Sequence, residues 1–185
     1  MRELERPAAG VTGYYAKEDR RWVIHVKAAT HRRNPIWHTI VAGPEVYNAE
    51  GLMAEASIFK AVSAVIPALK GVFLTYGGCG FFHAVIQLDK RVEGIQRNAI
   101  LGTFAAFPPL KRVAAVDTVV NIYDPHYDPQ DVEWAMATRF RLDKDLIIVP
   151  DALGHELNLA TDSGRGAKLG ECLGECLGEC CRSGF

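Results

Sequence analysis

The sequence has no long hydrophobic run and no excess of charge of one sign. No apolar stretch approaches the roughly 18 residues that a bilayer-spanning helix needs, and residues 1–7 are mostly polar, unlike the apolar core of a secretory signal. Because 21 basic and 22 acidic residues leave a formal net charge of −1, nothing favours nucleic acid or an anionic membrane as a partner. We therefore expect a cytoplasmic protein with no membrane span and no nucleic acid partner.

The sequence also lacks a cysteine framework. Four of its five cysteines fall within the last fourteen residues, which is not the spacing of a disulfide-rich secreted domain. Three of them end consecutive copies of Leu-Gly-Glu-Cys that begin at Leu169. Cysteines four apart would share one helical face and could bind zinc or an iron–sulfur centre if further ligands joined them. Because each copy also carries a helix-weakening glycine, we favour a tandem duplication or altered reading frame and predict no metal site.

The clearest secondary-structure signal lies between residues 111 and 149. The apolar run Val113–Val116 is typical of a strand that is covered on both faces. Asp128 and Pro129 form a helix start, because a carboxylate can cap free amides and proline is preset to helical φ. The helix that follows has an apolar stripe at Val132, Ala135 and Met136. A second apolar run at 146–149 completes a strand–helix–strand unit, which predicts a layered α/β domain.

Periodicity predicts further elements on either side. Alternation over 22–28 indicates a half-buried strand. Residues 72–76 and 81–88 are two further predicted strands, joined by a glycine-rich turn. We predict that this turn has a structural role and does not bind phosphate. Two amphipathic helices are expected at 51–66 and 90–104. Their predicted inward residues are Leu52, Ala56, Phe59, Val62 and Ile66 in the first, and Val92, Ile95, Ala99 and Ile100 in the second.

Five stretches, in this order along the chain, resemble one protein family. They are Thr12–Tyr15, Thr30–Ile36, Gly77–Gly80 with Phe82–Val85, Tyr123–Arg139, and Gly164–Gly170. The family is the UbiD family, decarboxylases that use prenylated FMN to exchange carbon dioxide on aromatic and α,β-unsaturated acids. The resemblance implies an α/β fold with a layered mixed β-sheet flanked by helices. It divides the chain into a remnant of the linker and active-site loop (1–16), a C-terminal α/β domain (17–160) and an irregular, low-complexity, cysteine-rich tail (161–185).

The resemblance also implies where catalysis would need an acid. In the family a Glu-x-x-x-x-Glu loop precedes the Thr-Gly-Tyr-Tyr motif, because a carboxylic acid must deliver a proton as carbon dioxide leaves. On this pattern Glu5 takes the first glutamate position, and Gly10 takes the second, the usual proton donor. Glycine cannot donate a proton. The flavin-binding domain of the family, and an arginine that completes its site, would precede Met1.

The remaining site residues are also placed by resemblance. Lys111 and Arg112 stand near the family position that contacts the cofactor phosphate, for which guanidinium is well suited. The substrate pocket is expected to include Ile36, His38, His155 and Leu157.

Three functions remain open from the sequence. In the first, the chain is a C-terminal portion of a UbiD-like decarboxylase and is inactive alone. In the second, it is a subunit that completes a split site with a partner carrying the flavin domain. The third is a non-catalytic interaction or assembly module. The oligomeric state also stays open, with a homo-oligomer as one outcome.

Overall fold

The computed structural model describes residues 2–4, 10–15, 18, 20–41, 43–122, 130–158, 160–161 and 165–173. Its elements follow in the order β1 (Arg2–Leu4), β2 (Arg20–Trp22), α1 (Pro44–Ser63), β3 (Leu69–Leu74), a short 3₁₀ turn η1 (Tyr76–Gly78), β4 (His83–Leu88), α2 (Ile95–Ala106), β5 (Arg112–Asp117), α3 (Gln130–Arg139), β6 (Leu146–Leu153) and β7 (Arg165–Leu173). Among these residues, no helix is long and apolar enough to cross a membrane.

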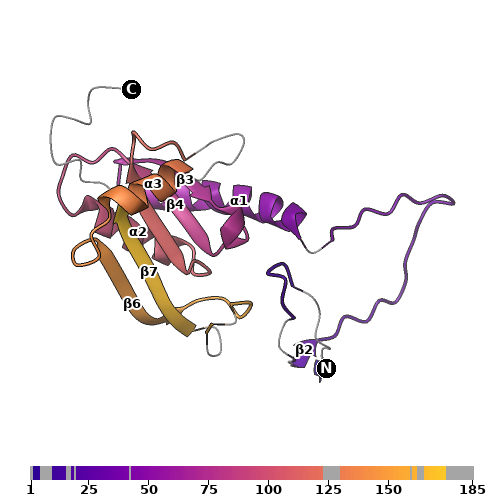
Figure 1. The fold of residues 1–185 in the computed structure, drawn as a ribbon. Helices are drawn as coiled ribbons and strands as arrows, with labels where there is room; N and C mark the ends of the chain where they lie inside the picture. The colour runs from indigo at the N-terminus through magenta and orange to yellow at the C-terminus, as the bar shows by residue number, and fades with distance from the viewer. Residues whose placement is uncertain are drawn as a thin grey trace.

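Five strands form one mixed sheet in the order β3-β4-β5-β7-β6 (Figure 1). Strands β4, β5 and β7 are parallel, and the edge strands β3 and β6 run antiparallel to their neighbours. This confirms the layered mixed sheet flanked by helices. The predicted strand–helix–strand unit is present as β5, α3 and β6, but β7 lies between the two strands.

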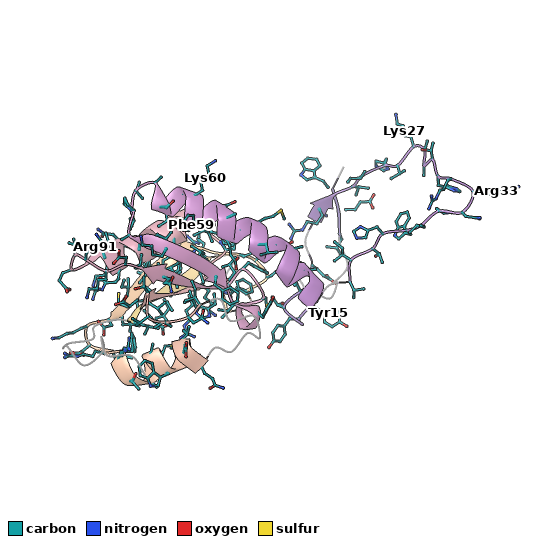
Figure 2. The ribbon with its side chains drawn as sticks, turned by 90° about the horizontal axis from the view of Figure 1, so that it is seen from above. Tyr15, Lys27, Arg33, Phe59, Lys60 and Arg91 are labelled. Carbon is teal, nitrogen blue, oxygen red and sulfur yellow. The ribbon has the colours of Figure 1, made fainter. Side chains whose placement is uncertain are left out.

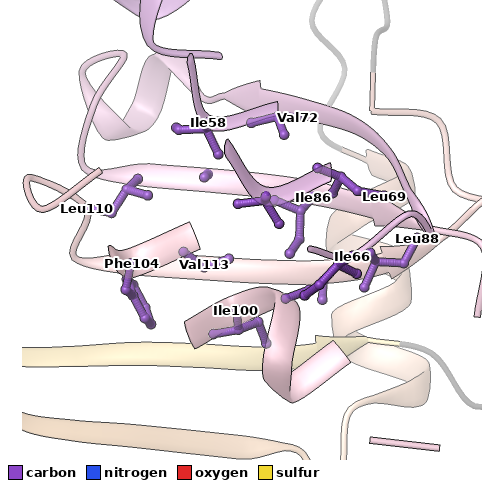
Figure 3. Close-up of a cluster of buried hydrophobic side chains, with 14 of the residues drawn as sticks. Ile58, Ile66, Leu69, Val72, Ile86, Leu88, Ile100, Phe104, Leu110 and Val113 are labelled. Carbon is purple, nitrogen blue, oxygen red and sulfur yellow. The ribbon is translucent and has the colours of Figure 1, made fainter. Parts of the chain in front are cut away.

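Both faces of the sheet are covered, as the apolar run in β5 predicted. Val113 and Ala115 belong to the cluster that packs against α1 and α2 (Figure 3). Ala114 and Val116 point to the other face and pack against α3. Each fully buried branched aliphatic side chain stabilises the fold by roughly 1.5–3 kcal/mol, so the alternation along β5 joins the two helical layers to one sheet.

The buried face of α1 differs from the predicted stripe. Val62 and Ile66 are buried as expected, whereas Leu52 and Phe59 are 62% and 39% exposed. The residues that face the sheet are Gly51, Ala54, Ile58 and Val62. Gly51 lies beside the glycine-rich turn, since a Cβ at this position would be in ordinary van der Waals contact with the Gly80 carbonyl oxygen at 3.5 Å. The buried stripe of α1 is therefore displaced from the predicted one, and Leu52 and Phe59 are turned outward.

The start of α2 was also predicted too early. The helix begins at Ile95, directly after Gly94, which has a φ of +81°. Such a backbone conformation interrupts a helix and favours glycine. Val92 consequently lies outside the helix and is 67% exposed, whereas Ala99 and Ile100 are fully buried as expected.

The predicted strand at 22–28 is absent from the described structure beyond its first residue. After β2 ends at Trp22, residues 23–41 run as an extended arm that projects from the α/β body (Figures 1 and 2). Ile24 and Val26, which the alternation placed on a buried face, are 86% and 76% exposed. A half-buried strand needs a sheet to cover one side, and no described part of the chain supplies one for this arm.

The structure of the C-terminal region also differs from the predicted one. Residues 165–173, expected to belong to an irregular tail, form β7 inside the sheet. Two residues hold β7 in its place in the sheet. The buried Lys168 donates from Nζ to the carbonyl oxygens of Pro108 (2.6 Å) and Leu110 (2.7 Å), and Gly170 lies directly beneath Ile100 of α2. The first copy of the Leu-Gly-Glu-Cys repeat is therefore in the fold, whereas residues 174–185 lie outside the described residues.

Adding one methyl group at Gly170 should destabilise the protein. Gly170→Ala would place Cβ 2.6 Å from Ile100 Cγ2 and 3.2 Å from Ile147 Cβ, and overpacking of this kind costs about 1–3 kcal/mol. The matched control is Gly102→Ala in α2, whose Cβ would meet only Val62 Cγ1, at 3.9 Å. Urea denaturation should give a lower midpoint for the first variant and an equal or higher one for the second. A Gly170→Ala protein as stable as wild type would contradict the close packing of β7 on α2.

Candidate functional site

A cavity of about 440 Å³ opens on the face of the sheet that α3 covers. It lies where β4 and β5 begin and where β3 ends, with the loop after β5 and the first turn of α3 as its outer wall. Apolar side chains from Phe73, Val85, Ile122 and Val132 line it, together with polar groups from Thr75, His83, Lys111 and Arg112. The volume is within the range of roughly 300–1,000 Å³ that small-molecule sites occupy, and so is the mixture of apolar walls with a few polar groups.

His83 is the most constrained polar group of the cavity. Its Nδ1 lies 3.1 Å from Thr75 Oγ1, which also accepts a hydrogen bond from the Gly78 amide at 3.1 Å. The buried hydroxyl is satisfied when it donates to Nδ1, and the neutral ring then carries its proton on Nε2. Nε2 is buried and has no hydrogen-bond partner among the described residues. A buried donor without an acceptor is costly, so this atom marks a place for an acceptor on a ligand.

The protonation state of His83 follows from its surroundings. Burial, and to a smaller extent the neighbouring positive charge of Arg112, together lower the pKa of His83 to about 4. The two residues are register partners on adjacent parallel strands. The imidazole is therefore neutral at neutral pH.

The glycine-rich turn before β4 packs directly against His83. A Cβ at Gly78 would lie 2.6 Å from both the backbone nitrogen and Cβ of His83, and Cys79 follows with a left-handed φ of 56°. The turn that the sequence predicted as structural therefore also forms part of the cavity wall, because Gly77 and Gly78 line it.

Arg112 and Lys111, the residues expected to bind phosphate, both line the cavity. The half-buried Arg112 donates from Nε to Glu171 Oε2 at 2.7 Å, and its Nη2 lies 3.0 Å from Met136 Sδ. Lys111 is exposed, with Nζ 3.4 Å from Asn158 Oδ1. The cavity thus has one cation held within its wall and one at its rim.

His155 and Leu157 lie in the loop after β6 and do not belong to the cavity lining. His155 Nδ1 accepts a hydrogen bond from the Leu157 amide at 3.2 Å, and its ring packs edge-on against Phe81. A Cβ at Gly10 would lie 3.6 Å from Leu157 Cδ2. The structure therefore brings the expected proton-donor position to the loop that was expected to contact substrate.

The other expected site residues are not brought to the cavity. Ile36 is 86% exposed on the extended arm, and His38 is exposed on the same arm. Arg33, also on the arm, is labelled in Figure 2 far from the α/β body. Glu5 lies outside the described residues.

Three polar residues of the site were missed from the sequence. His83 and Thr75 had a detectable signal, since they flank the glycine-rich turn at the end of one predicted strand and the start of the next. Glu171 had none, because it lies in the repeat. Groups of three or more metal-ligating side chains are absent from the part of the chain that the structure describes.

The cavity residues fit an aromatic ligand that carries an anionic group. Arg112 and Lys111 supply positive charge, His83 Nε2 supplies a donor, and the apolar walls suit a ring system. Flavin mononucleotide combines these features. Arg112 is the one residue whose fit is incomplete, because Glu171 already holds its Nε.

Comparison with known proteins assigns the chain to two domains of one enzyme. Residues 48–172 match the model of the 3-octaprenyl-4-hydroxybenzoate carboxy-lyase C-terminal domain, and residues 1–45 match the Rift-related domain of the same enzyme. The change from one to the other falls at the start of α1.

Among curated relatives, an uncharacterized protein in the cooM 5′ region of Rhodospirillum rubrum is 42% identical over 90% of this chain and 35% of its own length. Anhydromevalonate phosphate decarboxylase of Methanosarcina mazei is 40% identical over 90% of this chain and 39% of its own length. The chain therefore spans little more than a third of these relatives.

Two solved structures show the same fold. The UbiD-class enzyme HmfF from Pelotomaculum thermopropionicum, in complex with FMN, aligns with a TM-score of 0.84 and 39% identity over 93% of this chain and 38% of its own. An evolved dimeric form of HmfF in complex with prenylated FMN aligns with a TM-score of 0.78 and 35% identity over 93% and 36% of the two chains.

The lowered pKa of His83 makes stability depend on pH. The unfolded histidine, with a pKa of 6.5, binds more protons than the folded one, with a pKa of about 4, so stability rises with pH between these values. Lowering the pH from 6.5 to 4 should cost up to about 3 kcal/mol of unfolding free energy.

Urea denaturation across this pH range measures the effect. His83→Gln should flatten the dependence, whereas His31→Gln, on the exposed arm, should leave it as in wild type. Parallel pH profiles for wild type and His83→Gln would show that His83 is not a neutral buried group.

Proposed function

Since the chain belongs to the UbiD family of decarboxylases, we propose that it is the C-terminal portion of a carboxy-lyase that uses prenylated FMN. Its substrate would be an aromatic or α,β-unsaturated carboxylic acid. The observation that carries this proposal is the cavity under α3, where apolar walls, two cations and an unsatisfied histidine donor meet. We place this enzyme in the cytoplasm as part of the same proposal.

The residues of the cavity take separate roles. Arg112 and Lys111 attract and orient the cofactor phosphate, with the guanidinium giving direction and the ammonium giving charge. His83 donates from Nε2 to an acceptor on the bound ring system. When bound, the prenylated flavin supplies an electron-accepting carbon framework that stabilises the negative charge left by departing carbon dioxide. The apolar walls from Phe73 and Ile122 exclude water, which strengthens each of these interactions.

Proton delivery is the part of the reaction that this chain does not supply at the expected place. Gly10 lies in a tight turn, with its amide donating to the Tyr14 carbonyl at 2.8 Å, and it has no titratable group. General acid catalysis contributes about 10²- to 10⁴-fold to rates. We therefore propose that the chain has no measurable turnover alone and that an acid from another polypeptide completes the site.

A partner that carries the flavin domain is the second form of this proposal. The arm at 23–41 supports it, since Ile24, Ile36 and Trp37 are 86%, 86% and 84% exposed. Exposed apolar side chains in this number mark a surface that is normally covered. A non-catalytic assembly module would use the same arm but would have no need of the orphan donor at His83. A substrate-facing role for Ile36 and His38 would also require that partner, because it would have to fold the arm over the cavity. His155 and Leu157, in the loop after β6, would face substrate only if the partner extended the pocket to that loop.

Complementation tests the proposal. The chain should release no carbon dioxide from aromatic or unsaturated acids by itself, and should do so when co-expressed with a UbiD-type polypeptide that lacks only this C-terminal domain and is loaded with prenylated FMN. Ile36→Asp with Trp37→Asp should abolish co-purification, whereas Lys27→Ala on the same arm should leave it intact. Turnover by the isolated chain would contradict the partner requirement. A stable complex that decarboxylates none of these acids would favour the assembly module.

Restoring an acid at position 10 should replace the acid of the other polypeptide, and so raise the activity of a complex whose partner has lost its own proton donor. Gly10→Glu needs only a small adjustment, because its Cβ would lie 3.3 Å from the Tyr14 carbonyl oxygen. We expect kcat to increase by about 10²-fold, with Gly10→Gln, which is isosteric but cannot act as an acid, giving no increase. Equal rates for the two variants would show that position 10 does not deliver the proton.

A further inference from the structure

The direction in which Glu171 points is set by the alternation of β7. Lys168, Gly170 and Cys172 face α1 and α2, because Lys168 lies over the Phe104 ring and Gly170 beneath Ile100. Successive side chains of a strand point to opposite faces. Glu171 therefore faces α3 and the cavity side, next to Leu173, which packs in the α3 cluster.

This direction brings Glu171 to Arg112. Strand β7 pairs with β5 so that Leu169 is opposite Arg112 and Glu171 is opposite Ala114. Residues two apart across neighbouring strands are within reach of long side chains, and Glu171 Oε2 lies 2.7 Å from Arg112 Nε. The glutamate side chain is 7% exposed and the arginine side chain 31%. The pair is therefore largely removed from water and weakly screened.

The pair changes what Arg112 can offer a ligand. A guanidinium binds a phosphate best with two parallel N–H groups, and here the Nε–H is already donated to a carboxylate. The negative charge of Glu171 also opposes the approach of any other anion to Arg112. From this geometry we infer that Glu171 is an internal competitor that lowers the affinity of the cavity for phosphate-bearing ligands. The identity of the ligand as a flavin phosphate rests on the proposed function, whereas the competition itself rests only on the pair.

If the Glu171–Arg112 pair had only a structural role, removing Glu171 would change anion binding differently. If Glu171 served only to seat β7, its removal would lower stability and would weaken or leave unchanged the binding of anions. An internal competitor predicts the opposite sign for binding, because neutralising Glu171 frees a buried positive charge. The sign of the change in anion affinity therefore separates the two roles.

The experiment measures binding of inorganic phosphate, FMN and riboflavin to the full chain by calorimetry. Glu171→Gln, which has nearly the same shape without the charge, should bind inorganic phosphate and FMN roughly tenfold more tightly than wild type. Riboflavin, which has no phosphate, should show no gain. The control is Glu133→Gln, which removes the same charge from an exposed position on the cavity lining and should gain at most about twofold.

A double-mutant cycle assigns the gain to Arg112. Glu171→Gln combined with Arg112→Ala should bind phosphate no better than Arg112→Ala alone, because the competitor and the cation act as one unit. Circular dichroism and urea denaturation check folding, and Glu171→Asp, which retracts the carboxylate, provides an intermediate gain where Glu171→Gln is too unstable to measure. Unchanged or weaker phosphate binding by Glu171→Gln or Glu171→Asp would overturn the inference. A gain in phosphate affinity without decarboxylation by the assembled complex would instead count against the proposed function alone.

Discussion

The position of β7 between β5 and β6 is the constraint on which the rest of the structure depends. Lys168 fixes its position along the sheet through two carbonyl oxygens of the loop before β5, and Gly170 lets α2 approach it closely. A shift of one residue would send every side chain of the strand to the other face. With the observed register, β5 is paired on both sides and the guanidinium of Arg112 is held against Glu171 in the wall of the cavity.

Local patterns predicted the elements whose burial is decided by their own sequence. Val113–Val116 predicts a doubly covered strand, because a short run of apolar residues is typical of a strand that is buried on both faces. The buried side of α1 differs from the predicted stripe, because Gly51 and Ala54 face the sheet although glycine and alanine give little hydrophobic signal in the sequence. The strand β7 was missed because its pairing with β5 joins residues about sixty positions apart, and a repeat of glycine, glutamate and cysteine carries no strand pattern.

In the candidate site too, the sequence predicted some residues, whereas the role of others depends on long-range packing. Resemblance to the UbiD family located Lys111 and Arg112, and both line the cavity. It included His83 in one of its five stretches but gave it no role, because the importance of His83 comes from burial that leaves Nε2 without an acceptor among the described residues. The arm residues Ile36 and His38 remain predictions, because their role depends on a covering surface from outside the described chain. In the proposed function the cavity binds the ligand, and another polypeptide delivers the proton.

We propose that the cavity beneath α3 binds the cofactor ring and its phosphate. The most direct test is ¹H–¹⁵N NMR of the His83 imidazole during titration with FMN in the complex with the flavin domain. We expect a neutral ring whose Nε2 proton exchanges slowly with water and whose signals shift in proportion to FMN binding. Saturable FMN binding that leaves the His83 signals unchanged would contradict it, because the cofactor would then occupy another site.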